Sequence, residues 1–361
     1  MILISDTATR FPPDATELRI PDADAARVLL EQGRPDVLDV IRSRRGLYHD
    51  AYGVDAAAHL ERTERAVVLG VARLAMRHGT LGNDYHAYHN EDHALEILDR
   101  RLGQVIDALG VEALPGRDWL ALSLFATCHD LRQRENQQYF DGIGANELAN
   151  IAETHRILDA TGFERDRDAA LYAAIEIMIA GSTFDPTPRP TESSAFNSAD
   201  AARAGGALAP KLSGLLERRE PDWHTHPALA HALYLAQFAS DLDTANVGED
   251  FRHLTESGER LASEREMRAG RSLDTGASGP PVLGFLTTGQ VKYFFELHRF
   301  CSDLGTQVFA LGKRDNAPRV RQLAEQLQQR FGEQPAGTYT GNDVIRAQRE
   351  FVAQLRGPGS I

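Results

Sequence analysis

Apolar residues recur at spacings of three and four along most of the chain, the period of a helix with one buried face. The pattern is clearest at residues 66–76, 119–131, 169–179 and 291–311. Alternating runs of β-branched residues are almost absent, and only residues 1–5 hint at a strand. The pattern therefore predicts an all-α protein.

Proline and glycine divide this helical pattern into three parts. Residues 1–60 hold short helical pieces broken by prolines, which we interpret as an N-terminal extension. Residues 61–330 form the main helical region, with expected loops at 182–210 and 273–281. Residues 331–361 add one amphipathic helix, at about 342–355, and a short tail.

Composition narrows the function classes. The 361-residue chain has a formal net charge of −13, which argues against a non-specific nucleic-acid groove. It has two cysteines, no run of 18 apolar residues and no basic, apolar N-terminal leader. We expect a cytoplasmic protein without nucleic-acid or membrane partners.

A histidine pair is the first candidate for chemistry. His89 and His93 are four residues apart, so a helix would place both on one face, where one could bind metal and the other hold a proton. The alternative is two exposed histidines near a helix start. His86, three residues earlier, is expected at the surface.

A second signal is the dipeptide His129-Asp130, at the end of an almost wholly apolar helix. A buried carboxylate needs a partner because losing its hydration is costly. A divalent cation would satisfy both side chains, whereas an arginine is the alternative partner.

A further carboxylate comes from the helix expected at residues 233–247. Asp241 lies near its buried stripe and Asp243 projects away from it, so helix phase favours Asp241; the roles exchange if the helix ends early. His93, His129, Asp130 and Asp241 make a nitrogen–oxygen donor set that suits Zn²⁺, Mn²⁺, Fe²⁺ or Mg²⁺.

These motifs together resemble the class I cyclic nucleotide phosphodiesterases of the HD superfamily. The resemblance lies in Tyr88-His89-Asn90-x-x-His93, the following His129-Asp130, Asn146-Glu147-Leu148-Ala149, Ser240-Asp241-Leu242 and Gln290-Val291-Lys292-Tyr293-Phe294. It covers roughly residues 60–330 and implies an HD-domain, PDEase-like helical bundle.

The resemblance also implies roles for single residues. His89 would protonate the leaving oxygen, and Asp130 would bridge two metal ions. Tyr88, Gln290 and Tyr293 would contact the nucleotide. Glu153 and Asn90 would support the ligands.

Two positions depart from the family pattern. Gln133 stands where the family usually has the histidine of His-Asp-x-x-His, which leaves the surroundings of a second metal open. Thr244 replaces an asparagine, and the segment Asp-Leu-Asp-Thr-Ala-Asn also resembles general HD phosphohydrolases, in which the last ligand would be Asp243.

We expect a phosphodiesterase with divalent metal ions that hydrolyses a 3′,5′-cyclic nucleotide to the monophosphate. The alternatives are a phosphohydrolase of other nucleotides or phosphoesters, and a catalytically weak nucleotide-binding signalling module. The expected ligand is a small nucleotide, and a homodimer is the assembly to test.

Overall fold

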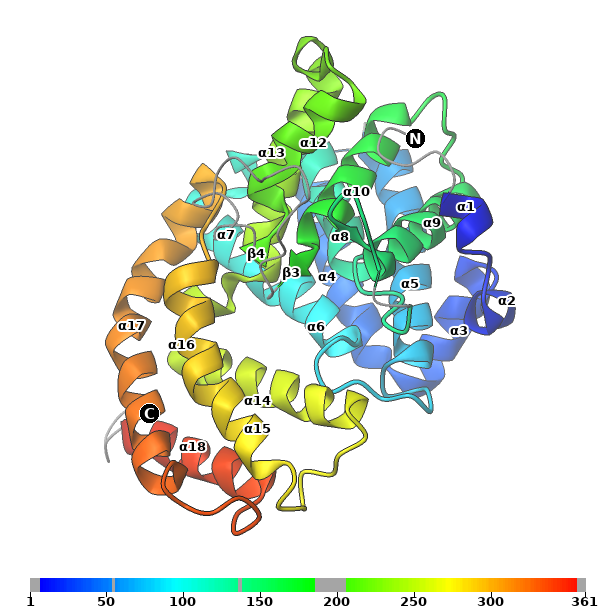
Figure 1. The fold of residues 1–361 in the computed structure, drawn as a ribbon. Helices are drawn as coiled ribbons and strands as arrows, with labels where there is room; N and C mark the ends of the chain where they lie inside the picture. The colour runs from blue at the N-terminus through cyan, green and yellow to red at the C-terminus, as the bar shows by residue number, and fades with distance from the viewer. Residues whose placement is uncertain (1–6, 54–55, 136–137, 186–205, 356–361) are drawn as a thin grey trace. The chain divides into compact units, whose positions relative to one another are not determined.

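Helices make up most of the computed structural model, which describes residues 7–53, 56–135, 138–185 and 206–355 (Figure 1). The protein is all-α, as the sequence predicts. Up to residue 243 the helices are α1 (Thr7–Arg10), α2 (Ala15–Arg19), α3 (Ala23–Gly33), α4 (Pro35–Tyr52), α5 (Ala57–Arg77), α6 (Glu91–Leu95), η2 (Glu96–Arg101), α7 (Leu102–Leu109), η3 (Val111–Ala113), α8 (Gly116–Cys128), α9 (Ala145–Ala160), α10 (Ala169–Ser182), η4 (Ala209–Lys211), α12 (Leu212–Arg219), η5 (Trp223–Thr225) and α13 (Pro227–Asp243). Beyond it they are η6 (Ala245–Gly248), α14 (Phe251–Arg268), α15 (Gly279–Gly284), η7 (Phe285–Gly289), α16 (Gln290–Lys292), η8 (Tyr293–Leu297), α17 (Asp303–Phe331) and α18 (Gly341–Leu355).

The chain forms two compact units. The first comprises Met1–Asp243 with Cys301–Leu304, and the second comprises Thr244–Phe300 with Gly305–Ile361. This division differs from the expected boundaries near residues 60 and 330. Contacts between segments that are distant in sequence define the two units. The positions of prolines along the chain do not indicate such contacts.

Helix α8 is the centre of the first unit, and α5, α6, α10 and α13 all pack against it. Every residue from Asp118 to Cys128 is buried. Burial of each large apolar side chain, such as Trp119 or Phe125, contributes about 1.5–3 kcal/mol. The rigid position of α8 fixes the two residues that follow it, His129 and Asp130.

The N-terminal segment belongs to the first unit. Helices α3 and α4 pack on α5, and Leu30 and Val37 are fully buried. The buried Arg73 of α5 donates a hydrogen bond to the carbonyl of Ile20 at 3.0 Å. The described residues of this N-terminal segment therefore pack as part of the first unit.

Two short hairpins interrupt the helices. Strands β1 (Tyr139–Phe140) and β2 (Ile143–Gly144) are antiparallel, and Asp141 and Gly142 between them both have positive φ. Such a turn matches the twist of a two-residue hairpin. Strands β3 (Phe184–Asp185) and β4 (Gly206–Ala207) also pair antiparallel. The strand expected at residues 1–5 lies outside the described residues.

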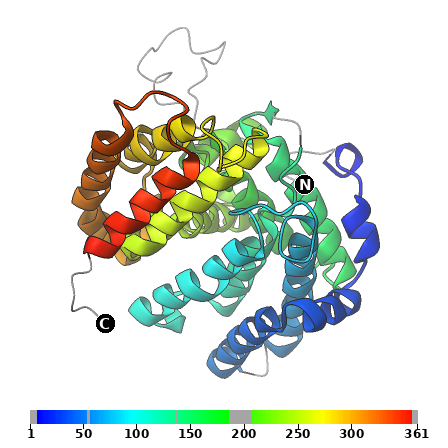
Figure 2. The same cartoon turned by 90° about the horizontal axis from the view of Figure 1, so that it is seen from below.

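The second unit has its own apolar core. Phe251 and Leu254 of α14, Leu323 of α17 and Phe351 of α18 are buried in it. Figure 2 shows the red α18 alongside the yellow-green α14, which it contacts. The amphipathic helix predicted near the C-terminus is α18.

The helix expected over residues 291–311 is interrupted. The chain runs through α16 and η8, leaves the helix at residues 298–302, and re-enters one at Asp303. The backbone N–H groups of Cys301 and Ser302 donate to the carboxylate of Asp241, at 2.7 and 2.8 Å. Apolar spacing cannot reveal a break that a distant carboxylate stabilises.

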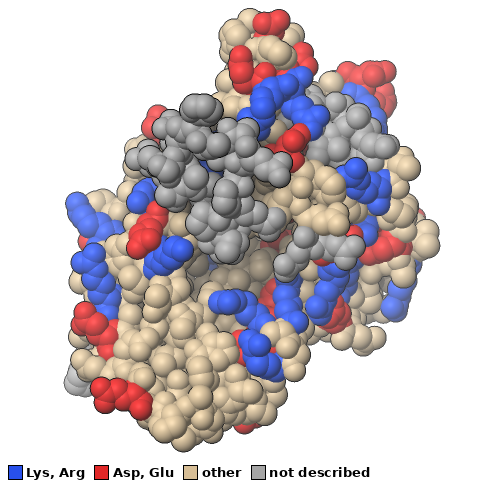
Figure 3. All heavy atoms as spheres, viewed as in Figure 1, with Lys and Arg blue, Asp and Glu red and all other residues tan. Residues whose placement is uncertain are grey.

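Acidic and basic side chains are interspersed over the described part of the face in Figure 3. Among the described helices, none combines the length and the apolar character that a membrane span requires.

Candidate metal centre

Asn90 places His93 at the start of α6. Its Oδ1 accepts hydrogen bonds from the N–H groups of Asp92 and His93, at 2.9 and 3.4 Å, which makes it the N-cap. Its Nδ2 donates to the carbonyl of His86 at 2.6 Å. Asn90 therefore orients a candidate ligand, the supporting role expected for it.

His89 precedes the helix, so the expectation of one shared helical face is wrong. The rings of His89 and His93 are nevertheless close, with centroids 6.4 Å apart. The buried ring of Tyr88 packs on the His93 ring at 4.4 Å. This contact supports the imidazole of His93, whereas the sequence had suggested a contact with substrate.

His129 follows α8 directly and is buried. Its Nδ1 lies 3.1 Å from the carbonyl oxygen of Phe125. A carbonyl only accepts, so Nδ1 carries the proton and Nε2 is the basic nitrogen of the neutral ring. Nε2 faces Asp130 Oδ2 at 3.1 Å and Asp243 Oδ1 at 3.4 Å.

This arrangement brings three acceptors together. Among the described residues, neither His129 Nε2 nor Asp130 Oδ2 has a hydrogen-bond partner, although both atoms are buried. A lone pair that faces two carboxylate oxygens requires a cation, which is either a proton or a metal ion. Burial alone would lower the pKa of His129, but Asp130 and Asp243 outweigh it and raise that pKa well above its usual value.

The structure brings Asp243 into the cluster and leaves Asp241 outside it. Asp243 Oδ1 lies 3.0 Å from His93 Nε2. The carboxylate of Asp241 instead accepts bonds from Cys301 N and from the N–H and hydroxyl of Ser302. Asp241 is fully buried, as helix phase predicts, but its carboxylate faces Cys301 and Ser302 and not the histidines, so its expected place among the ligands is corrected to Asp243.

The imidazoles and carboxylates of this cluster lie at distances compatible with a shared metal ion. The nitrogen–oxygen distances between His93 or His129 and Asp130 or Asp243 run from 3.0 to 3.7 Å. Tetrahedral ligands with bonds of about 2.1 Å lie roughly 3.4 Å apart. His93, His129 and Asp130 could hold a metal ion, and Asp243 lies beside them with its Oδ1 3.0 Å from His93 Nε2.

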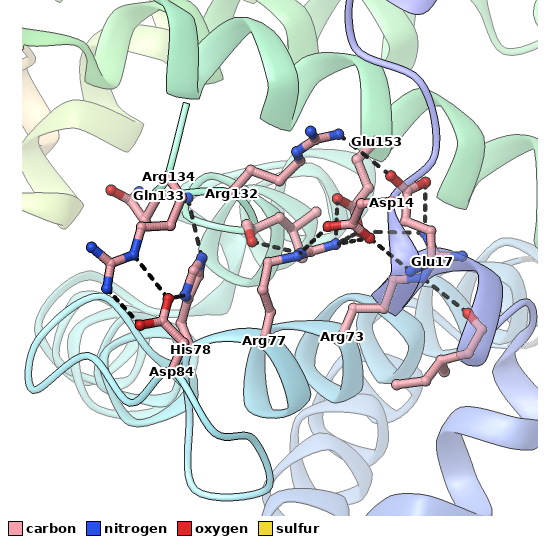
Figure 4. Close-up of polar contacts among 12 residues, drawn as sticks. Asp14, Glu17, Arg73, Arg77, His78, Asp84, Arg132, Gln133, Arg134 and Glu153 are labelled. Atoms are coloured by element: carbon pink, nitrogen blue, oxygen red, sulfur yellow. Dashed lines mark hydrogen bonds and ion pairs between the residues drawn. The ribbon is translucent and has the colours of Figure 1, made fainter. Parts of the chain in front are cut away.

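Residues of helix α9 bind the backbone next to His129 and Asp130. Asn150 donates to the carbonyl of His129 and accepts from the N–H of Arg132. Glu153 is buried and paired with Arg73 and Arg77 (Figure 4). Arg77 in turn donates to the carbonyl of Leu131 at 2.6 Å. Glu153 therefore acts on the turn after His129-Asp130 through Arg77, and Asn150 is a supporting residue that the sequence reading missed.

Glu147 is a second missed residue. It lies in the first turn of α9, and burial together with the charge of Asp130 raises its pKa to about 7, against the opposing effect of His89 and His129. The segment Asn146-Glu147-Leu148-Ala149 gave the only sequence signal for it.

A second group, His78, Asp84 and His86, could also hold a metal ion by its spacing. Figure 4 shows His78 and Asp84 of this group. Its hydrogen bonds oppose that use. His78 Nε2 accepts the N–H of Gln133 at 3.2 Å, so Nδ1, the nitrogen nearer Asp84, carries the proton. Arg134 binds both carboxylate oxygens of Asp84, at 2.9 and 2.5 Å. His86, expected at the surface, is buried.

Gln290 and Tyr293 belong to the second unit, on α16 and η8. Both are half-buried, and the Tyr293 ring lies against the His298 ring at 5.7 Å. Their expected contact with a nucleotide stays a prediction.

Comparison with known proteins adds no assignment: no family model matches the chain, and no curated protein sequence matches it.

Proposed function

We propose that the protein is a metal-dependent phosphohydrolase whose centre is His93, His129, Asp130 and Asp243. One observation supports this most strongly: the basic Nε2 of buried His129 faces two carboxylates without a proton donor between them. A protein rarely keeps such a group of acceptors unless a cation occupies it. The donor set of two imidazoles and two carboxylates suits Zn²⁺, Mn²⁺, Fe²⁺ or Mg²⁺.

The chain's own residues supply the rest of the chemistry. A bound divalent ion acidifies a water and offsets phosphate charge. His89 lies beside His93, with ring centroids 6.4 Å apart, and an imidazole at this place is the group that would carry the proton for a leaving oxygen. The Phe125 carbonyl holds the tautomer of His129 that leaves Nε2 basic.

A 3′,5′-cyclic nucleotide is the leading substrate class. Its support is the motif resemblance, with Gln290 as the polar contact and Tyr293 as the aromatic contact for a base. Nucleoside mono- and polyphosphates are the alternative substrates, since the same metal chemistry serves any phosphoester.

A substrate panel tests the proposal. Chelator-treated protein is supplied with Mn²⁺, Mg²⁺ or Zn²⁺ and assayed on cyclic mono- and dinucleotides, nucleotides and guanosine polyphosphates. We expect metal-dependent turnover that Asp130→Ala abolishes. Turnover that survives Asp130→Ala refutes the site, and no turnover with any substrate favours a binding module.

The base contact is tested separately. Gln290→Ala and Tyr293→Ala should raise KM for the best cyclic nucleotide while metal affinity stays unchanged. If both variants turn over that substrate as the wild type does, the base contact is wrong and the metal chemistry stands.

A further inference from the structure

The two carboxylate oxygens of Asp130 have different neighbours. Oδ2 faces the Nε2 atoms of His129 and His93, at 3.1 and 3.7 Å. Oδ1 accepts a hydrogen bond from the side-chain amide of Gln133, Nε2, at 2.9 Å. Asp130 and Gln133 are both buried. One oxygen is thus available to a cation, and the other is bonded to an N–H group.

A chain of hydrogen bonds fixes which end of the Gln133 amide faces Asp130. The chain starts at the backbone N–H of Glu135, which can only donate, and Asn146 Oδ1 accepts it at 3.1 Å. Asn146 therefore presents Nδ2 to Gln133 Oε1, at 3.4 Å. Gln133 must then present Nε2 to Asp130. Turning the Gln133 amide over would place its oxygen against the carboxylate and lose the bond from Asn146.

The backbone of Gln133 is held as well. Its N–H donates to Nε2 of the buried His78 at 3.2 Å. The residue is thus fixed by hydrogen bonds at the backbone and at both ends of its amide. Moving it away from Asp130 would leave buried polar groups without partners, which is costly.

We infer that this centre takes one divalent ion per chain, because Gln133 occupies the Asp130 oxygen that a second ion would need. This inference rests on the proposed metal centre and concerns only its nuclearity. In two-metal hydrolase sites the ions lie about 3.5–4 Å apart. A carboxylate that bridges two such ions gives each of them one oxygen. At Asp130 the second oxygen, Oδ1, instead accepts the N–H group of Gln133. The positive end of this N–H dipole would repel a second cation.

Mn²⁺ binding to chelator-treated full-length protein tests the inference without an activity assay. Equilibrium dialysis or native mass spectrometry counts the bound ions. Electron paramagnetic resonance then distinguishes an isolated Mn²⁺ from a bridged, exchange-coupled pair. We expect one ion per wild-type chain, with the spectrum of an isolated ion, and none in Asp130→Ala.

Two variants test the role of Gln133. Gln133→Ala removes the N–H group and should tighten binding of a second Mn²⁺ by roughly tenfold or more, the effect of one hydrogen bond to a charged group. Gln133→His offers an imidazole at the same position and should bind two ions with a coupled spectrum. Gln138→His adds a histidine at an exposed position nearby and should behave as the wild type.

Each result is decisive. Two coupled ions in the wild type overturn the inference and leave the proposed function intact. A count that stays at one in both Gln133 variants also overturns it, because Gln133 would not be what excludes the second ion. No bound ion in the wild type contradicts the proposed function itself, and the inference with it.

Discussion

Asp241 and Asp243 lie two residues apart on α13 and have opposite surroundings. Asp243 contacts the imidazoles of His93 and His129, whereas Asp241 binds the backbone of Cys301 and Ser302. The residue types of the cluster were readable from the sequence, because His129-Asp130 ends a buried helix. Whether Asp241 or Asp243 lies beside the histidines depends on contacts with segments distant in sequence. The helical period of α13 does not indicate these contacts.

Substitution of the two aspartates separates their roles. We expect Asp243→Asn to weaken Mn²⁺ binding by more than about 100-fold, since losing a residue that only orients a ligand already costs about 10–100-fold. Asp241→Asn should keep the metal affinity but lower the free energy of unfolding by about 2 kcal/mol, because its hydrogen bonds to Cys301 and Ser302 lose their charge. Calorimetric titration and chemical unfolding measure the two effects. The reverse pattern would restore Asp241 as the ligand.

His298 predicts a pH dependence of stability in the second unit. Burial, with the charges of Lys313 and Arg299, lowers its pKa to about 3 from 6.5. The unfolded chain therefore binds a proton below pH 6.5 that the folded chain does not. This contribution to stability is complete above pH 6.5 and falls by about 1.4 kcal/mol for each pH unit below it, down to pH 3.

The His298→Gln variant isolates this effect. Glutamine does not titrate, and its amide offers a donor and an acceptor for Thr244 and Lys313. Unfolding free energies measured from pH 7.5 down to 4 should show equal slopes above pH 6.5 and, well below pH 6.5, a slope smaller than the wild-type slope by about 1.4 kcal/mol per pH unit. His78 and His155, whose pKa values burial also lowers, to about 3 and about 4, contribute to the slope that remains in both proteins. Equal slopes below pH 6.5 would show that His298 is protonated in the folded protein.

Helices were the most predictable elements. The periods at residues 66–76, 119–131 and 169–179 correspond to α5, α8 and α10, because each buries an apolar face or nearly its whole circumference. The short α6 was not predictable in this way. Five residues cannot show a period, and α6 is defined by its Asn90 cap.

The cap of α6 gives a prediction for that helix. Asn90→Ala removes the acceptor for the N–H groups of Asp92 and His93 and should cost about 1 kcal/mol of stability. It should also weaken Mn²⁺ binding, because His93 is no longer held at the helix start. Asn90→Ser keeps a cap acceptor and should recover most of the stability. Thermal unfolding with and without Mn²⁺ checks this, and an Asn90→Ala protein with wild-type metal affinity would contradict the positioning role.

The chain as a whole combines two units, of which the first contains the candidate centre. The four candidate ligands come from the segments around α6, after α8 and at the end of α13, all within the first unit. An ion that binds only the folded state stabilises it by about 2.7 kcal/mol at 100 times its Kd. We therefore expect Mn²⁺ to slow amide hydrogen exchange at these segments while α14 and α18 keep their rates. Equal protection of α14 and α18 would place the bound ion elsewhere or couple the two units.

The most direct test of the proposed function measures bound Mn²⁺ and phosphoester turnover in the same samples. Chelator-treated protein is titrated with Mn²⁺ in the presence of the best substrate from the panel. The account predicts no turnover without metal, a rate that rises with the ion bound at His93, His129, Asp130 and Asp243, and no rise in Asp243→Asn. Turnover by the metal-free protein, or a fully loaded centre that hydrolyses no phosphoester, would contradict it.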